Sequence, residues 1–201
     1  MINHTSFAPD SLAGKRIGFA MTGSFCTFSR VFEQVRRLKE TGAILQPILS
    51  YNAWSLDTRF FTAEEVHSRL TDICGCEIWH TLQEVEPIGP KKLLDLLIVA
   101  PCTGNTLGKL AAGIVDTPVT MAVKSHLRNG RPVLIAVSTN DGLSASARSI
   151  GTLQAHRGFF FVPYEQDDPK EKPASLVARL DLIPEAASAA LAGKQLPILW
   201  R

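Results

Sequence analysis

The sequence predicts an α/β fold of three layers, in which helices cover both faces of a doubly wound parallel sheet. Strand-sized apolar runs alternate along the chain with segments of helical periodicity, a pattern typical of parallel sheets. The run at residues 94–100 has little polar alternation, as expected for a strand that is buried on both faces. Such connections are right-handed in nearly all proteins, and the expected strand order is 3-2-1-4-5-6.

Local signals place the elements along the chain. Apolar residues recur at helical spacing in residues 29–41, and Gly42 suits the end of that helix. Thr62 and Glu65 match a capping box at the start of the next helix, and Pro118 suits the first turn of a later one. The expected strands are residues 16–21, 44–49, 77–79, 94–100, 132–137 and 159–162. The expected helices are residues 29–41, 62–73, 81–87, 107–112, 117–128, 145–156 and 174–191, the last broken at Pro184.

Bulk properties favour one globular domain. Residues 1–201 are expected to form it, with a tail at 1–13, a long loop at 164–173 and a helical segment at 174–201. Hydrophobic residues make up 45% of the chain and the formal net charge is +2, which indicates neither disorder nor affinity for nucleic acid. No apolar run reaches the ~18 residues of a membrane span, and the N-terminus lacks the apolar core of a signal peptide. These features favour a cytoplasmic protein that contacts no membrane.

Polar turns follow three of the expected strands. Residues 22–26 follow the first strand, residues 101–106 the fourth, and residues 138–142, all small or polar, the fifth. In a doubly wound sheet, ligands bind outside the carboxyl ends of the strands, where the strand order reverses. The sequence therefore predicts one binding crevice formed by these three turns. The alternative is that each turn serves only to connect a strand to a helix.

The first of these turns suits a phosphate group. Gly23 allows a close approach to the backbone, Ser24 offers a hydroxyl, and the start of the following helix offers N–H groups to an anion. The sequence contains neither Gly-x-Gly-x-x-Gly nor a P-loop with Gly-Lys-Ser/Thr. These absences disfavour a dinucleotide held in the usual Rossmann manner and the hydrolysis of a nucleoside triphosphate.

The turn after the fourth strand combines Pro101, Thr103, Gly104, Asn105 and Thr106. The amide of Asn105 both donates and accepts hydrogen bonds, which suits the edge of a heteroaromatic ring. The alternative is that Thr103 or Asn105 only caps the helix that follows. Both roles are compatible with each other.

Residues 100–116, Ala-Pro-Cys-Thr-Gly-Asn-Thr-Leu-Gly-Lys-Leu-Ala-Ala-Gly-Ile-Val-Asp, resemble the signature of the flavoprotein superfamily, which includes flavin-dependent cysteine decarboxylases and flavin prenyltransferases. The resemblance implies the flavoprotein (Rossmann-like) fold, bound flavin mononucleotide (FMN) and a trimer-based homo-oligomer with flavin at subunit contacts. It implies a phosphate near Ser24, a ring near residues 101–105, and Ser50 near the ribityl chain or the phosphate. The implied cofactor site comprises Gly23, Ser24, Ser50, Pro101, Thr103, Gly104, Asn105, Thr106, Ser138 and Asn140.

Five further motifs, at residues 86–92, 116–122, 125–129, 138–143 and 166–170, resemble the dipicolinate synthase B subfamily. The resemblance covers about residues 14–182. It implies an oxidoreductase subunit in the mother cell of a sporulating bacterium. With its companion dipicolinate synthase A, which binds a nicotinamide cofactor (NADP), it would convert a dihydrodipicolinate-type intermediate to dipicolinic acid. The carboxylates of this small dicarboxylate substrate are expected to pair with cations, for which Lys109, Lys124 and Arg128 are candidates.

Two other functions remain open. The chain is alternatively an FMN-binding subunit without a catalytic role, or another flavin-dependent enzyme, a decarboxylase or a prenyltransferase. Asn140 matches the asparagine of the superfamily motif Pro-Ala-Met-Asn, but residues 137–139 are Val-Ser-Thr, which argues against cysteine decarboxylation.

The remaining chemically active residues favour structural roles. His67 lies on an expected amphipathic helix, whereas His80 lies where decarboxylase relatives carry a catalytic histidine. His126 is expected to face a ligand or a neighbouring subunit, or else to stabilise a helix end. Cys102 is expected to be a small buried residue. Cys-Gly-Cys at 74–76 is too closely spaced for a zinc site, and no metal site is expected.

Overall fold

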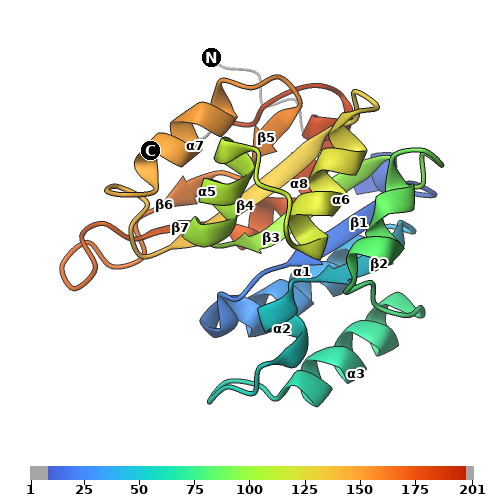
Figure 1. Ribbon diagram of the computed structural model, residues 1–201, viewed down its shortest axis with the longest axis horizontal. Helices are drawn as coiled ribbons and strands as arrows, with labels where there is room; N and C mark the ends of the chain where they lie inside the picture. The colour runs from blue at the N-terminus through green and yellow to red at the C-terminus, as the bar shows by residue number, and fades with distance from the viewer. Residues whose placement is uncertain (1–8, 198–201) are drawn as a thin grey trace.

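The computed structural model describes residues 9–197, and one mixed sheet forms its centre (Figure 1). Within these residues the sheet has the order β2-β1-β3-β4-β7-β6, and β5 also pairs with β4. The strands β1 to β5 are parallel, whereas β6 and β7 are antiparallel to their neighbours. The strands are β1 (Arg16–Met21), β2 (Ile44–Leu49), β3 (Leu96–Cys102), β4 (Val133–Thr139), β5 (Phe159–Phe161), β6 (Tyr164–Glu165) and β7 (Leu176–Ala178).

The expected strand order is confirmed. The third expected strand, residues 77–79, is reduced to one parallel bridge between Trp79 and Ile48. Around this bridge, the N–H of Trp79 donates to the carbonyl of Pro47 (3.0 Å) and the N–H of Leu49 donates to the carbonyl of Trp79 (2.9 Å). Proline has no N–H to donate, which suits the weakly paired outer side of β2. The order from Trp79 through β2, β1, β3 and β4 to β5 therefore matches 3-2-1-4-5-6.

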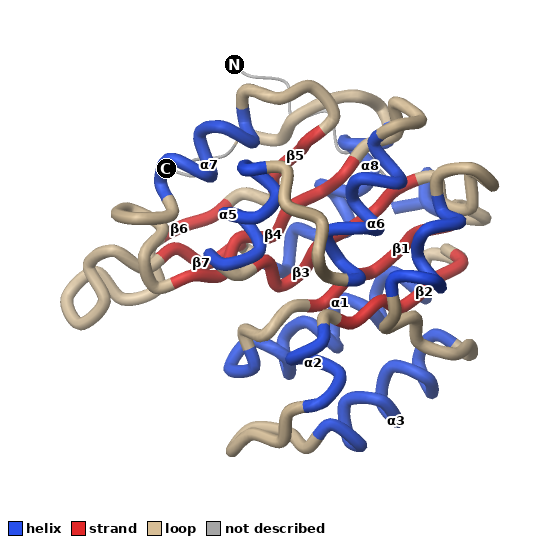
Figure 2. The backbone as a smooth tube through the Cα atoms, viewed as in Figure 1, coloured by secondary structure: helices blue, strands red, loops and turns tan. Residues whose placement is uncertain are grey.

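Helices cover both faces of the sheet (Figure 2), which confirms the three-layer architecture. Side chains alternate between faces along a strand. Phe19 and Ile98 therefore pack in a cluster with α1 and α8, while Leu97 and Val99 pack in another with α6 and α7. The helices are α1 (Phe28–Glu40), α2 (Tyr51–Ser55), α3 (Ala63–Cys74), α4 (Leu82–Val85), α5 (Gly104–Ala112), α6 (Pro118–Leu127), α7 (Ala147–Gln154) and α8 (Ile183–Leu191). Short 3-10 helices lie at Pro9–Leu12, Phe25–Thr27, Glu86–Ile88 and Leu180–Leu182.

The helix starts follow the expected capping chemistry. Thr62 and Glu65 form a reciprocal capping box at the start of α3. Thr117 caps α6 and is followed by Pro118 in its first turn. Thr103 caps α5 by accepting a hydrogen bond from the N–H of Thr106. Thr103 therefore caps this helix, which is one of the two roles that the sequence allowed for it.

The C-terminal part differs from the sequence prediction. Residues 164–173 were expected to be a loop and residues 174–191 a helix, but β6 and β7 form an antiparallel hairpin here. β7 is three buried residues long, too short for helical and strand periodicity to be distinguished. It pairs with the carboxyl end of β4, whose first half pairs with β5. Pro184 does not break a helix, because it lies in the first turn of α8, where a missing N–H has no cost.

None of the helices within residues 9–197 is long and apolar enough to span a bilayer.

His126 is part of the core between α6 and β4. Its side chain is fully buried, and Nε2 lies 3.0 Å from the carbonyl oxygen of Pro132. Within the described residues, Nδ1 has no hydrogen-bond partner. Burial lowers the pKa of His126 from 6.5 to about 4, because the charged ring is not solvated there. Facing a ligand cavity, one of the roles expected from the sequence, does not fit this burial.

We expect the stability of the protein to fall as the pH decreases from about 6.5 to 4. In this window the unfolded chain binds a proton at His126 that the folded chain does not bind, so protonation favours unfolding. The contribution is roughly 3 kcal/mol by pH 4. Urea unfolding between pH 7 and pH 4 should show a shallower pH dependence for His126→Gln than for the wild type. The exposed His156→Gln is the control and should keep the wild-type slope; equal slopes for all three proteins would contradict this assignment.

Candidate functional site

Three loops meet at the carboxyl edge of the parallel strands. They follow β1, β3 and β4, the strands expected from the sequence to end in one crevice. The hydroxyl groups of Ser24 and Ser138 lie 2.7 Å apart, which joins the loop after β1 to the end of β4. Thr22 joins the loop after β1 to the loop after β3. The three segments are therefore in direct contact.

The buried side chain of Thr22 fixes the first two loops relative to each other. Its Oγ1 donates a hydrogen bond to the carbonyl of Pro101 (2.7 Å) and accepts one from the N–H of Thr103 (3.0 Å). The N–H of Thr22 also donates to the carbonyl of Pro101 (3.2 Å). The hydroxyl of Thr22 thus provides a hydrogen-bond partner for the carbonyl of Pro101 and for the N–H of Thr103, where the regular pairing between strands ends.

Asp141 organises the third loop. Its carboxylate accepts hydrogen bonds from the hydroxyls of Thr139 and Ser146, the latter at 2.8 Å. The bond from Thr139 is the main reason why the pKa of Asp141 is below its usual range. The carbonyl of Asp141 accepts the N–H groups of Ser144 and Ser146. The loop is therefore held by its own hydrogen bonds.

Gly104 allows α5 to begin against this loop. A Cβ at this position would lie 2.6 Å from the hydroxyl oxygens of Thr139 and Ser146 and 2.9 Å from Oδ1 of Asp141. No other residue type fits without moving the third loop. The glycine in the turn after β3 is thus required by close packing rather than by backbone conformation.

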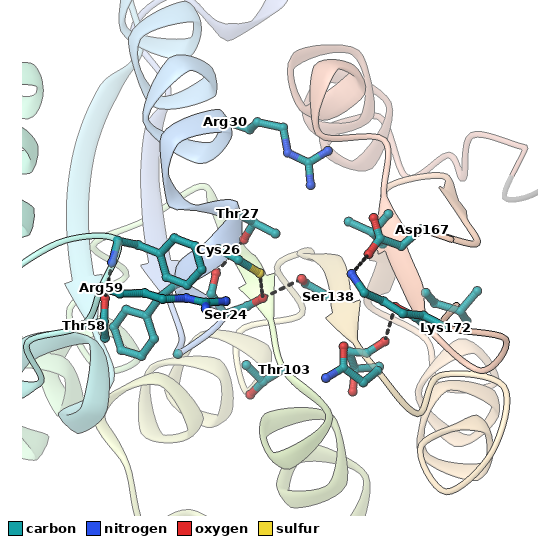
Figure 3. A pocket seen from close by; sticks show the side chains of 18 residues that line it. Ser24, Cys26, Thr27, Arg30, Thr58, Arg59, Thr103, Ser138, Asp167 and Lys172 are labelled. Carbon is teal, nitrogen blue, oxygen red and sulfur yellow. Dashed lines mark hydrogen bonds and ion pairs between the residues drawn. The ribbon is translucent and has the colours of Figure 1, made fainter. Parts of the chain in front are cut away.

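A cavity of about 660 Å³ opens between these loops, within the usual range of roughly 300–1,000 Å³ for ligand pockets (Figure 3). Its other walls come from the start of α1, from residues 58–60 and from the β6–β7 hairpin. Phe25, Phe60, Leu176 and Val177 give it an apolar side. The hydroxyls of Ser24, Thr103 and Ser138 give it a polar side. The cavity suits a ligand with a flat apolar part and a polar end.

Three cations surround the cavity. Arg30 extends from α1, Arg59 from the segment after α2, and Lys172 from the β6–β7 hairpin, so they approach from three directions (Figure 3). Lys172 pairs with Asp167 at 2.9 Å, and the guanidinium of Arg59 lies 4.8 Å from the ring centre of Phe60. Asp167 is the one carboxylate among the described lining residues. The electrostatic field of the cavity therefore favours anions.

Half of the cofactor residues predicted from the sequence line this cavity: Gly23, Ser24, Thr103, Ser138 and Asn140. The other predicted residues lie around it. Pro101 and Thr106 are buried beneath the loop, Gly104 packs against Asp141, and Asn105 is exposed on α5. Ser50 caps α2 by accepting from the N–H of Ala53 (3.3 Å), while its own N–H donates to Met21 at the end of β1.

The cations predicted to bind substrate lie elsewhere in this chain. Lys109 pairs with Asp116 at 2.8 Å. Lys124 and Arg128 line a second cavity of about 450 Å³ between α5, α6 and α7. None of these three cations lines the 660 Å³ cavity of the same chain, so their predicted role in substrate binding is not supported.

Arg30, Arg59 and Lys172 were not among the residues expected from the sequence. Arg30 lies six residues after Ser24, in the first turn of α1. Its position shortly after the turn predicted to bind a phosphate was the sequence signal that could have identified it. Arg59 and Lys172 lie in irregular segments, whose return to the crevice depends on tertiary packing. Thr22 lies in the turn expected at residues 22–26, but its hydrogen bonds to Pro101 and Thr103 join segments that are distant in sequence.

His67 and His80 stack on opposite faces of Trp54, with ring centres 3.8 and 3.6 Å from that of the indole. Neither lines the 660 Å³ cavity. Cys102 is fully buried, and burial raises the pKa of its thiol, as expected for a structural cysteine. Residues 9–197 contain no group of three or more His, Cys, Asp or Glu side chains placed to hold a metal ion.

Comparisons with known proteins give a consistent result. The flavoprotein family model matches residues 6–177. The dipicolinate synthase B subunit of Bacillus subtilis (strain 168) is 44% identical over 190 residues, which cover 94% of this chain and 95% of that protein. The crystal structure of the dipicolinate synthase B subunit from Bacillus halodurans C has a TM-score of 0.87 at 41% identity, over 94% of this chain and 98% of that chain. An FMN-dependent cysteine decarboxylase has a TM-score of 0.68 at 19% identity, over 90% and 99% of the chains, which shows a shared fold.

We expect Thr22→Val to lower the free energy of unfolding by about 1–3 kcal/mol, because the N–H of Thr103 loses its partner in a poorly solvated position. Valine keeps the branched shape and removes only the hydroxyl. Thr22→Ser, which keeps the hydroxyl, is the matched control and should lose less. Urea unfolding of the three proteins measures the difference. Equal stability of the valine and serine variants would show that the hydroxyl is not what joins the two loops.

Proposed function

Because the chain belongs to the flavoprotein family and, within it, to the dipicolinate synthase B group, we propose that the cavity between the three loops binds FMN and that the chain is the flavin-binding oxidoreductase subunit of a dipicolinate synthase. The observation that carries this proposal is the contact of Ser24 with Ser138 beside a cavity of suitable size. The contacts of individual residues with FMN are part of the same proposal.

The phosphate of FMN fits the start of the first helical segment. In the Ser24–Ser138 pair one hydroxyl donates to the other, which leaves a single O–H of the pair as a donor for the phosphate, and the first N–H groups of a helix have no partner within it. Such N–H groups favour an anion. The position of a Cβ on Gly23 has no neighbour closer than 3.4 Å, so the chain itself leaves the approach to this backbone open. Ser50, at the end of the neighbouring strand β2, is proposed to contact the ribityl chain.

The flavin ring fits the apolar side of the cavity. Phe25 and Leu176 provide apolar walls, while Thr103 and Asn140 provide polar groups for the ring edge. Asn105 is exposed at the start of α5, and its side chain makes no hydrogen bond within residues 9–197. We propose that it meets the flavin where a second copy of the chain closes the site, in a trimer-based homo-oligomer.

A bound flavin supplies two-electron redox chemistry, since its ring accepts a hydride. The chain itself contributes binding, orientation and a charged cavity wall. The proposed reaction removes two hydrogens from a dihydrodipicolinate-type ring and leaves the aromatic product. The proposed partner is dipicolinate synthase A with its nicotinamide cofactor (NADP), and the proposed location is the cytoplasm of the mother cell.

One observation favours a second candidate, an FMN-binding subunit that leaves proton abstraction to its partner. Histidine is absent from the described residues that line the cavity, and Asp167, the one carboxylate there, already pairs with Lys172. A general base must reach the proton it removes. In this version the companion protein supplies the base, while this chain holds the flavin.

We expect the purified chain to bind FMN and Ser24→Ala and Ser138→Ala to weaken that binding about 10- to 100-fold each. A hydrogen bond to a charged group contributes about 1.5–3 kcal/mol, and each variant removes either the hydroxyl that donates to the phosphate or the hydroxyl that orients it. Ser144→Ala is the matched control, because Ser144 is exposed in the same loop region and its hydroxyl contacts only the carbonyl of Asp141. Fluorescence titration with FMN gives the dissociation constants. No FMN binding by the wild type would end the proposal.

We expect oxidation of dihydrodipicolinate to require both proteins of the synthase and to depend on FMN. Assays with each protein alone and with the two together, before and after removal of FMN, separate the two candidates. Activity of this chain with FMN alone would contradict the non-catalytic version. Full activity of the complex after complete removal of FMN would contradict both.

A further inference from the structure

Arg30 is a cation without a partner inside the candidate site. It is exposed in the wall of the 660 Å³ cavity, and its side chain makes no ion pair, hydrogen bond or ring contact within residues 9–197. The side chain extends from α1 towards the region of Asp167 on the opposite hairpin (Figure 3). Arginine side chains at a cavity wall without a carboxylate partner are well suited to bind an anionic ligand.

Lys172 faces the same cavity from the β6–β7 hairpin. Its Nζ lies 2.9 Å from Oδ2 of Asp167, and this hydrogen bond raises the pKa of Lys172. Lys172 thus stays protonated through the physiological range. The N–H of Lys172 donates to the carbonyl of Asp168 (2.7 Å), which closes the turn that carries it. The hairpin therefore holds the ammonium group on the cavity side opposite Arg59.

The cations of the cavity lie on walls other than the loop junction where the flavin phosphate is proposed to bind. Arg30, Arg59 and Lys172 face one carboxylate, Asp167, which leaves a formal surplus of two positive charges. The phosphate has neutral donors at the loop junction, from the Ser24–Ser138 pair and the helix start. An oxidised flavin ring carries no net charge, so it does not need the cations on the walls formed by α1 and the hairpin. These cations are therefore placed to contact a second, anionic ligand.

We propose that Arg30 and Lys172 bind the two carboxylates of a small ring dicarboxylate beside the flavin, with Arg59 closing the third side. The inference rests on the proposed function and deepens it, because it assigns the substrate-specificity residues within the same cavity. The guanidinium of Arg30 forms two parallel hydrogen bonds with one carboxylate. Lys172 meets the other carboxylate as a point charge, and Asp167 positions its ammonium group.

The test is a titration of the FMN-loaded chain with pyridine-2,6-dicarboxylate. We expect Arg30→Gln and Lys172→Gln to raise the dissociation constant about 10- to 100-fold each, since a charge-assisted hydrogen bond is lost. Their FMN dissociation constants should stay within about two-fold of the wild type. Matched controls are Arg36→Gln on the exposed side of α1 and Lys170→Gln in the same hairpin, neither of which lines the cavity. Both controls should bind like the wild type.

A second ligand makes the test specific for two carboxylates. Pyridine-2-carboxylate should bind the wild type more weakly than the dicarboxylate, and the difference should largely disappear in Lys172→Gln or Arg30→Gln. Unchanged dicarboxylate binding in Arg30→Gln overturns the inference. So does a loss confined to FMN, which would make Arg30 a phosphate ligand and leave the flavin proposal intact. If the wild type binds no FMN, the proposed function fails, and the same titration of the chain alone still decides the role of Arg30.

Discussion

The site depends on the two hydrogen bonds that the hydroxyl of Thr22 makes. Parallel strands end at one edge of the sheet, but this only brings their loops near one another and does not fix them. By donating to Pro101 and accepting from Thr103, the hydroxyl converts two separate loop ends into one rigid unit. Thr103 then caps α5, so the same chain of hydrogen bonds orients a helix. The polar side of the cavity is thus a consequence of buried backbone N–H and C=O groups that need hydrogen-bond partners.

The third loop is fixed in a different way. Asp141 accepts hydrogen bonds from three hydroxyls and two N–H groups of its own loop, and Gly104 leaves space for this cluster against the start of α5. The position of Ser138 opposite Ser24 therefore requires both a local carboxylate and a distant glycine. Because hydrogen bonds within the chain fix these groups, the loop does not depend on ligand contacts for its shape, which reduces the entropy lost when a ligand binds.

The sequence predicts those parts of the molecule that depend on local chemistry. Apolar runs predict β1, β3 and β4, and the topology of alternating strands and helices predicts that their loops meet. Capping residues such as Thr62 and Thr117 predict helix starts, because a side-chain oxygen acts on an N–H only three residues away. By contrast, β7 is three residues long and exists because it pairs with the end of β4. Local patterns contain no information about such a partner, and residues 174–178 were predicted to be helical for that reason.

The cations of the cavity illustrate the same limit. Lys109, Lys124 and Arg128 were expected to bind carboxylates because they lie within or near the motifs that resemble a known family. The cations that line the cavity come instead from α1, from the segment after α2 and from the β6–β7 hairpin. Two of them, Arg59 and Lys172, lie in segments without regular periodicity, and only their tertiary position shows which way they face.

The cavity separates its neutral and charged groups. Hydroxyls lie where the loops meet, whereas the cations come from outer walls, so the two ligands proposed for the cavity would not compete for the same donors. Arginine stays protonated at all physiological pH values and cannot accept a proton. Lys172, held protonated by Asp167, cannot do so either. The described lining residues therefore include no free base, and in the proposed reaction the proton removed during aromatisation would go to a group outside this cavity.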